Sequence, residues 1–176
     1  MREIIRASAW AGFDELVKEL GGDPAAILAA AQVDRAALQD PERYVPLRAF
    51  LDTQTIAAEK LGLRDFGLIM GQRQTMSVLG ALSIAIINSP TAREGIEIAG
   101  RYMHVHNPAF VMTLAPMPKT SRDFLSVGVE LRRNTGREQN DERIIASMHK
   151  SLGQLGGGRY KPYEVWFTHE PISPIA

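Results

Sequence analysis

The sequence predicts an α+β fold, in which an N-terminal helical bundle is followed by a β-β-α-β unit with a small antiparallel sheet. Up to Tyr102, apolar residues recur every three or four positions, as they do in amphipathic helices. From Phe110 onward, short runs alternate apolar and polar residues, which is typical of strands. Helices grouped first and strands grouped later favour α+β over an alternating α/β arrangement.

Stop signals divide the helical part into separate segments. Gly21-Gly22 ends the first helix, and Asp23-Pro24 begins the second with an N-cap residue and a proline at the first helical position. Asp40-Pro41 and Val45-Pro46 mark a loop, because the residue before proline favours extended geometry. We expect helices over residues 4–20, 47–61, 66–73, 79–87, 90–102 (with Ser89 as N-cap) and 138–155.

Three segments are expected to be strands. Residues 110–114 and 124–131 flank a proline-containing connection, so they should pair antiparallel as neighbours along the chain. The aromatic and β-branched run Tyr163–Phe167 is expected to add a third strand after the last helix. This order completes the β-β-α-β unit.

Length and composition indicate one globular domain over residues 1–176. Apolar residues make up 45% of the 176 residues, which is ordinary for a packed domain. The chain has 20 basic and 20 acidic residues, so it lacks the basic excess by which proteins usually bind DNA phosphates. The absence of cysteine excludes disulfides and thiolate metal sites.

The termini bear on location and on extent. Asp14 and Glu15 interrupt the apolar run that a signal peptide would need, and no apolar stretch reaches the roughly 18 residues that span a membrane. We therefore expect a cytoplasmic protein with no membrane association. The end of the chain, Pro171–Ala176, reads as a loop directly after a strand, so we expect the domain to be part of a longer protein.

No catalytic residues, metal ligands or cofactor-binding motifs are predicted, so the chain is not expected to be an enzyme. His104 and His106 could share one face of a strand and suit a metal, but no third ligand stands at a recognisable spacing. Polar side chains at a helix end or pocket wall explain the pair better. The charged residues Glu138, Asp141, Glu142 and Arg143 are interpreted as a solvated helix start, with the acids favoured by the helix dipole.

A ligand site is predicted where the last helix of the bundle meets the sheet. The carbonyls and side chains at a helix end are free to contact a ligand, and Tyr and Trp carry polar groups that need partners when buried. A mostly apolar cavity with a few polar groups is the usual form of a small-molecule site. For Phe110 and Met112 a plain core role is the alternative. The candidate residues are Tyr102, His104, His106, Phe110, Met112 and Trp166.

Five segments together resemble the N-terminal, arabinose-binding-type effector domain of AraC-type transcription regulators. They are AGFDELVKELGGDP (11–24), DPERYVPL (40–47), LRDFGLIMGQRQ (63–74), LGALSIAIINSPTAREGIEIAGRYMHVHNPA (79–109) and VWFTHEP (165–171). In that family the domain precedes a region with two helix-turn-helix motifs that reads promoter DNA, and nothing in this chain matches that region. The resemblance implies a small-molecule effector as partner, promoter DNA only through the missing C-terminal domain, and a possible homodimer.

Two function classes follow. The resemblance and the missing catalytic constellation favour an effector-sensing and oligomerisation module of a transcription factor, with the helix over residues 138–155 as a candidate dimer interface. The alternative is a stand-alone small-molecule-binding protein or a small enzyme without a recognisable catalytic motif.

Overall fold

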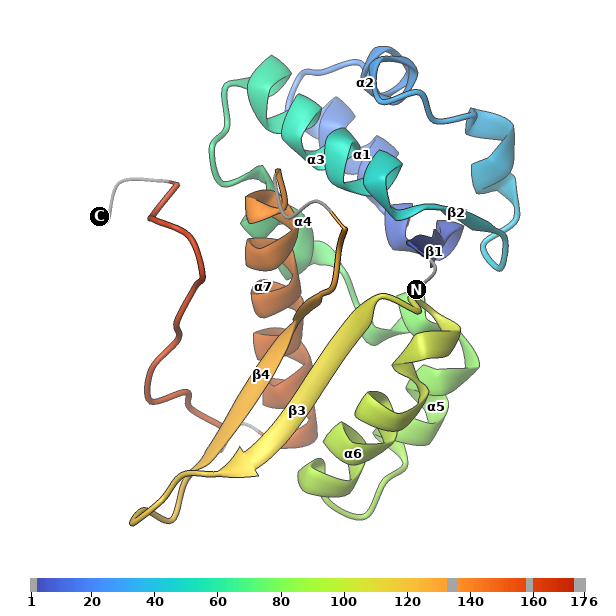
Figure 1. Ribbon diagram of the computed structural model, residues 1–176. Helices are drawn as coiled ribbons and strands as arrows, with labels where there is room; N and C mark the ends of the chain where they lie inside the picture. The colour runs from blue at the N-terminus through green and yellow to red at the C-terminus, as the bar shows by residue number, and fades with distance from the viewer. Residues whose placement is uncertain (1–2, 133–135, 158–159, 173–176) are drawn as a thin grey trace.

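The computed structural model describes residues 3–132, 136–157 and 160–172, and it confirms the α+β class (Figure 1). The α-helices are α1 (Phe13–Glu19), α2 (Pro24–Ala30), α3 (Leu47–Leu61), α4 (Phe66–Arg73), α5 (Ala81–Ile87), α6 (Ala92–Tyr102) and α7 (Glu138–Leu155). Strands β1 (Ile4–Arg6) and β2 (Tyr44–Pro46) form one antiparallel pair, and β3 (Phe110–Pro116) and β4 (Asp123–Val129) form another. Short 3₁₀ segments are η1 (Ala7–Trp10), η2 (Arg35–Gln39), η3 (Met76–Leu79) and η4 (Met103–Val105).

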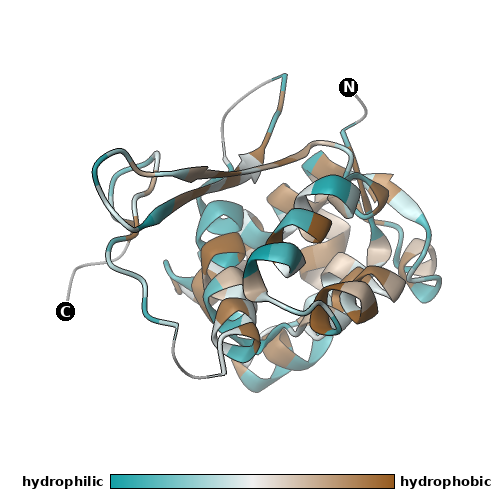
Figure 2. Ribbon diagram, turned by 90° about the horizontal axis from the view of Figure 1, so that it is seen from below, coloured by the Kyte–Doolittle hydropathy of each residue, from teal (hydrophilic) through white to brown (hydrophobic). Residues whose placement is uncertain are grey.

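The elements gather at two ends of a central helix pair. Helices α1 to α3 and the β1–β2 ribbon lie at one end, α5 and α6 lie at the other, and α4 and α7 run between them (Figure 1). The hairpin β3–β4 forms a layer along one side of the helices (Figure 2). The larger apolar core surrounds Phe13, Phe50 and Phe66, whereas a smaller one around Met76 and Ile86 joins α5 and α6 to β3.

Several predicted elements are confirmed, the helices with their bounds and the hairpin strands to within two residues. Helices α3, α4 and α7 occupy the predicted residues. The Asp23 side chain accepts a hydrogen bond from the Ala25 N–H at 2.9 Å, as expected of an N-cap. The hairpin has the predicted antiparallel pairing, with Phe110 opposite Val129.

The first predicted helix is wrong in its N-terminal half. Residues 4–6 form β1 instead, because Ile5 pairs with Val45 of β2 and both side chains are buried in the larger core. Helix α1 begins only at Phe13, after Gly12 adopts a left-handed conformation with φ of 79°.

The predicted start of the sixth helix is also shifted. Thr91, rather than Ser89, is its N-cap, since the Thr91 hydroxyl accepts from the Glu94 N–H at 3.2 Å. The Ser89 hydroxyl donates instead to the Ile86 carbonyl at 2.6 Å, at the end of α5. In the same region, α5 begins at Ala81 and not at Leu79.

The third strand is not formed, so the predicted β-β-α-β unit is β-β-α. Residues 163–167 have no strand hydrogen bonding and are exposed. Their side chains contact the hairpin instead: the Trp166 and Phe124 ring centres lie 5.7 Å apart, and the Arg122 guanidinium lies 3.6 Å from the Tyr163 ring centre. The aromatic content that gave the segment its strand propensity is used in ring contacts without backbone pairing.

Helices α4 and α7 approach each other at two glycines. A Cβ on Gly67 would lie 1.9 Å from the Gln139 carbonyl oxygen, and a Cβ on Gly71 would lie 2.3 Å from the Arg143 carbonyl oxygen. Helix α7 also binds both ends of α4: the Gln139 side chain accepts from the Gly67 N–H at 2.7 Å, and Lys150 donates to the Gln72 carbonyl at 2.9 Å. The Gln139 contact satisfies an N–H of the first turn that Asp65, the N-cap residue, does not bind with its side chain, and the Lys150 contact satisfies a carbonyl of the last turn.

Substituting either glycine should separate the two helices. We expect Gly67→Ala and Gly71→Ala each to lower the free energy of unfolding by about 2 kcal/mol or more, because the atom nearest to the added methyl group is a backbone carbonyl oxygen that cannot move aside easily. Urea unfolding followed by circular dichroism measures the change. Gly153→Ala in α7 is the matched control: nothing lies within 4 Å of its Cβ position, so it should be neutral or stabilise by up to about 1 kcal/mol. Equal effects at all three positions would contradict this account of the contact.

Candidate functional site

The structure does not bring the six candidate ligand residues together. Tyr102 and His104 are exposed, on α6 and η4, and the His104 Nδ1 lies 3.0 Å from the Arg101 carbonyl oxygen. Phe110 and Met112 are half-buried on β3 and pack against the smaller core, which is the alternative given for them above. The polar surface pair and the apolar strand pair therefore have different surroundings.

Trp166 lies at the opposite end of the hairpin from Phe110. Its side chain is 65% exposed and packs on Phe124, which stands opposite Ala115 in the hairpin register. Five residues of strand, roughly 16 Å, separate Ala115 from Phe110. Trp166 therefore does not share a site with the residues at the helix end.

His106 is the one polar candidate that is buried. It is 8% exposed, and its Nδ1 has no hydrogen-bond partner among the described residues. Burial, together with smaller contributions from the nearby charges of Arg143 and Arg6, lowers its pKa to about 4. The ring is therefore neutral at physiological pH and stands close to two cationic side chains.

His106, Arg6 and Arg143 belong to a set of polar residues between the two ends of the molecule, here called the Arg143 cluster. Arg143 donates from Nη1 to the Gln74 side-chain oxygen at 2.8 Å and from Nη2 to the Asn140 side-chain oxygen at 3.1 Å. The Arg143 guanidinium lies 5.0 Å from the Phe50 ring centre. The members of the cluster are Arg6, Trp10, Gln74, His106, Asn140 and Arg143.

Distant segments of the chain supply these residues. Gln74 is buried where the chain leaves α4, and its amide donates to the Ala9 carbonyl at 2.7 Å, next to Trp10. The Trp10 ring packs on Phe50 with ring centres 4.6 Å apart. The Arg6 backbone N–H donates to the His106 carbonyl at 3.0 Å. The cluster therefore depends on the packing of β1, η1, α3, α4, η4 and α7.

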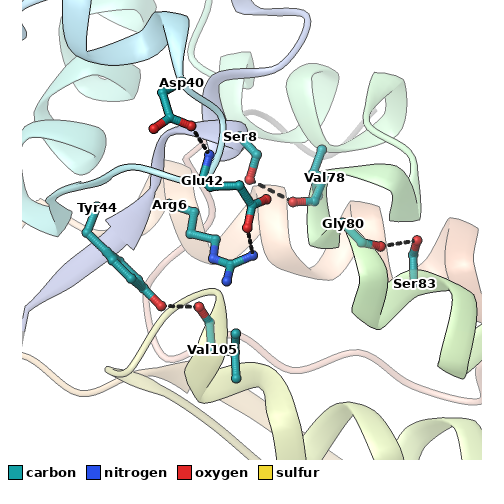
Figure 3. A network of polar contacts seen from close by, with 9 residues as sticks. All are labelled: Arg6, Ser8, Asp40, Glu42, Tyr44, Val78, Gly80, Ser83 and Val105. Carbon is teal, nitrogen blue, oxygen red and sulfur yellow. Dashed lines mark hydrogen bonds and ion pairs between the residues drawn. The ribbon is translucent and has the colours of Figure 1, made fainter.

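A seam of polar contacts borders the cluster and holds the two ends together (Figure 3). The Arg6 Nη1 pairs with Glu42 at 2.5 Å, and the Ser8 hydroxyl donates to the Val78 carbonyl at 2.7 Å. The Tyr44 hydroxyl donates to the Val105 carbonyl. The Arg6 side chain therefore belongs to the seam through Nη1, and the Arg6 backbone N–H binds the backbone of His106.

Charge in the cluster is unbalanced. Within the described residues Arg143 makes no ion pair, and burial lowers its pKa to about 10, so it keeps its charge at neutral pH. Asp141 favours that charge, but the Asp141 carboxylate is bound by Arg137 at 2.7 Å. Three further buried N–H donors find no acceptor in the part of the chain that the structure describes: Arg6 Nε, Trp10 Nε1 and Asn140 Nδ2.

A separate cleft of about 390 Å³ opens between the α1–α2 turn and the end of α3. It is lined by Leu20, Gly21, Gly22, Asp23, Ala26, Ile27, Lys60 and Leu61. Asp23 is already engaged as the N-cap of α2, and Lys60 donates to the Ala26 carbonyl at 3.4 Å. The two charged side chains of the cleft are therefore already hydrogen-bonded to the backbone of α2.

Neither a metal cluster nor a membrane-spanning helix is found among the described residues. No group of three or more His, Cys, Asp or Glu side chains among the described positions could hold a metal ion. Within the same stretches, none of the helices combines the length and apolarity required to cross a bilayer.

The family assignment comes from comparison with known proteins. The family described as "Arabinose-binding domain of AraC transcription regulator, N-term" matches residues 21–175. The chain belongs to this family. It is 30% identical over 176 residues to the HTH-type transcriptional regulator VirS of Mycobacterium tuberculosis, in both strain CDC 1551 / Oshkosh and strain ATCC 25618 / H37Rv. The match covers 98% of this chain and 51% of each relative, so the chain spans about half the length of these curated relatives.

Most of the cluster in this AraC-type domain was missed by the sequence analysis. The predicted solvated start of α7 is wrong: Asn140, Asp141 and Glu142 are each no more than 9% exposed, and burial raises the pKa of both acids. The hairpin and the C-terminal segment flank α7, which removes the water that the charge pattern suggested (Figure 1). A usable signal was present, since Asn140 and Arg143 are three residues apart and share a helix face with the buried Ile144.

His106 should make the stability of the AraC-type domain depend on pH. The unfolded chain takes up a proton near pH 6.5 and the folded chain only near pH 4, so the unfolding free energy falls as pH drops through this window. The loss should reach about 3 kcal/mol, at about 1.4 kcal/mol per pH unit. Asp141 and Glu142 have raised pKa values and act in the opposite direction.

The measurement is therefore a difference between proteins. Urea unfolding of the wild type and of His106→Gln over this pH range should show a smaller acid loss in the variant, because the acids are common to both. His104→Gln, which changes an exposed ring, serves as the control and should follow the wild type. Parallel curves for the wild type and His106→Gln would contradict the assignment.

Proposed function

We propose that this domain senses a small-molecule effector and controls a helix-turn-helix region carried by a longer protein. The observation that carries the proposal is the family match over residues 21–175, combined with coverage of about half of relatives named as HTH-type transcriptional regulators. The family and these relatives indicate a transcriptional regulator rather than an enzyme. A regulator acting on chromosomal DNA would work in the cytoplasm, where we place the protein.

The contacts of α7 support a route by which an effector could act. Arg143 and Asn140 place this helix in the polar cluster, and Tyr160, just beyond its end, packs on His149 with ring centres 5.6 Å apart. From there the chain runs back along α7 (Figure 1). It reaches His169, which is close enough to Asp141 and Glu142 to lower the pKa of both carboxyl groups against the larger opposite effect of burial. An effector that shifts α7 would therefore shift the C-terminal segment that lies along it.

Native mass spectrometry of the purified 176-residue chain tests this function. We expect either a co-purified small molecule or a complex of higher mass after incubation with the low-molecular-mass fraction of a cell extract. A stand-alone binding protein or small enzyme is the second candidate, and it would bind a ligand without altering DNA binding in the longer protein. A chain that stays ligand-free under both conditions would contradict both candidates.

The domain alone should not bind promoter DNA with sequence specificity. Its 20 basic and 20 acidic residues give no net charge, whereas phosphate neutralisation dominates the affinity of most DNA-binding proteins. Gel-shift titration of residues 1–176 against promoter fragments is expected to show at most weak, salt-sensitive binding. Tight binding that discriminates between promoter sequences would overturn the assignment of DNA recognition to another region.

The domain is expected to form a homodimer, which is the commonest closed assembly. Helix α7, the candidate interface above, offers little free surface, because among its residues only His149 and Gln154 are exposed. Ile84 and Ile87 of α5 are 64% and 55% exposed one turn apart, and a twofold axis would bring this apolar face against its copy.

Light scattering of the wild type should report a dimer, and Ile84→Glu combined with Ile87→Glu should give a monomer. Trp166→Glu removes an equally exposed apolar side chain elsewhere and should leave the dimer intact. A wild-type monomer at high concentration would contradict the homodimer, and a dimeric double variant would contradict the α5 interface.

A further inference from the structure

The Arg143 cluster contains more hydrogen-bond donors than acceptors. Arg6 Nε, Trp10 Nε1 and Asn140 Nδ2 are buried with no acceptor among the described residues, and His106 Nδ1 can also donate in one tautomer. Buried donors without acceptors are rare, because each loses its hydration without gaining a hydrogen bond in return. Such a concentration of unmet donors beside an unpaired guanidinium calls for an acceptor with negative charge.

Contacts link the residues that carry these donors to one another. Trp10 and Arg143 both pack on the Phe50 ring, and Gln74 connects Arg143 to the Ala9 carbonyl beside Trp10. Arg6 is hydrogen-bonded to the backbone of His106, which lies near enough to Arg143 to respond to its charge. Gln74 thus connects Arg143 to η1, the chain continues from η1 back to β1, and the Arg6–His106 hydrogen bond connects β1 to η4.

The local charge sets the class of ligand. Arg6 is neutralised by Glu42 at 2.5 Å, whereas Arg143 makes no ion pair within the described residues, so the cluster has an excess of one positive charge. A carboxylate carries one negative charge and accepts several hydrogen bonds in the plane of its oxygens. Neutral sugars carry no charge and would leave the positive charge of Arg143 unpaired.

We propose that the Arg143 cluster binds the carboxylate group of a small organic acid and that this acid is the effector. Arg143 supplies the charge, and Arg6 Nε, Trp10 Nε1 and Asn140 Nδ2 donate to the carboxylate oxygens. Arg143 is only partly buried, so the cluster is not sealed from solvent. The assignment rests on the effector-sensing function proposed above.

Trp10 provides the signal for a direct test. The chain has two tryptophans, so Trp166→Phe, which changes an exposed side chain, leaves Trp10 as the one fluorophore of its kind. Sodium benzoate and sodium hexanoate are titrated into this protein, with benzamide and hexanamide as uncharged counterparts of the same shape. We expect saturable changes in Trp10 fluorescence and a higher Tm with the carboxylates, weaker effects with sodium phosphate at equal ionic strength, and none with the amides.

Variants separate the cluster from general charge effects. Arg143→Gln should weaken carboxylate binding by at least about tenfold, since it removes the charged partner, and Arg143→Lys should recover part of the loss. Arg93→Gln is the matched control, because it removes the same charge from an exposed ion pair with Asp123 and should bind as the parent does. If Arg143→Gln does not fold, Trp10→Phe keeps the packing on Phe50 and removes one donor, and calorimetry should show several-fold weaker binding.

Each outcome decides the proposal. Equal binding of amides and carboxylates, no saturable carboxylate binding, or unchanged affinity in Arg143→Gln or in a folded Trp10→Phe variant would overturn it. If the carboxylates fail while native mass spectrometry reveals a different bound molecule, the effector-sensing function stands and the carboxylate site is wrong. If neither experiment reveals a ligand, both proposals fall.

Discussion

The backbone-to-backbone contact of α4 with α7 is the constraint on which the rest of the structure depends. Gly67 and Gly71 let the two helices approach until the missing side chains are replaced by carbonyls of Gln139 and Arg143. Gln139 and Lys150 then satisfy the ends of α4, so the eight-residue helix needs no cap of its own. With this pair fixed, α1 to α3 pack at one end, α5 and α6 at the other, and the hairpin along the side.

The same contact determines which polar side chains meet. Gln74 stands at the end of α4 and Arg143 in the second turn of α7, and the close contact of the helices brings their side chains to 2.8 Å. Burying a cation without an anion is costly, so the fold keeps Arg143 beside amide oxygens and aromatic rings that offset part of the cost. Arg6, which pairs with Glu42, connects this region to the polar seam that includes the Tyr44–Val105 hydrogen bond.

The sequence was informative where local signals were strong and unreliable where distant partners decide. Long apolar periodicity located α3 and α7, and alternation located the hairpin. Strands β1 and β2 are three residues each and pair across about forty residues of chain, so neither could be recognised alone. Tyr163–Phe167 has the composition of a strand, but pairing requires an available sheet edge, and only packing shows that none is used.

The candidate site illustrates the same limit. Amphipathic position identified His106 as polar and near a helix end, and it is the one predicted residue that joins the Arg143 cluster. Arg143 itself could not be predicted, because an arginine among acids at a helix start normally faces water, and its burial depends on elements that are distant in the sequence. The residue types alone were therefore less informative about the site than the α4–α7 contact that brings these residues together.

The glycine contact also constrains how this molecule can move. Two helices in backbone contact cannot slide past each other by small side-chain adjustments, because no flexible atoms lie between them. Helices α4 and α7 should therefore rotate as one rigid body, with displacement absorbed by the polar seam around Arg6 and Tyr44 and by the chain segments beyond Leu155. When the α4–α7 pair rotates by a few degrees, atoms far from the pair move farther than atoms near it. The largest displacement would therefore occur at the far end of the hairpin and along the C-terminal segment.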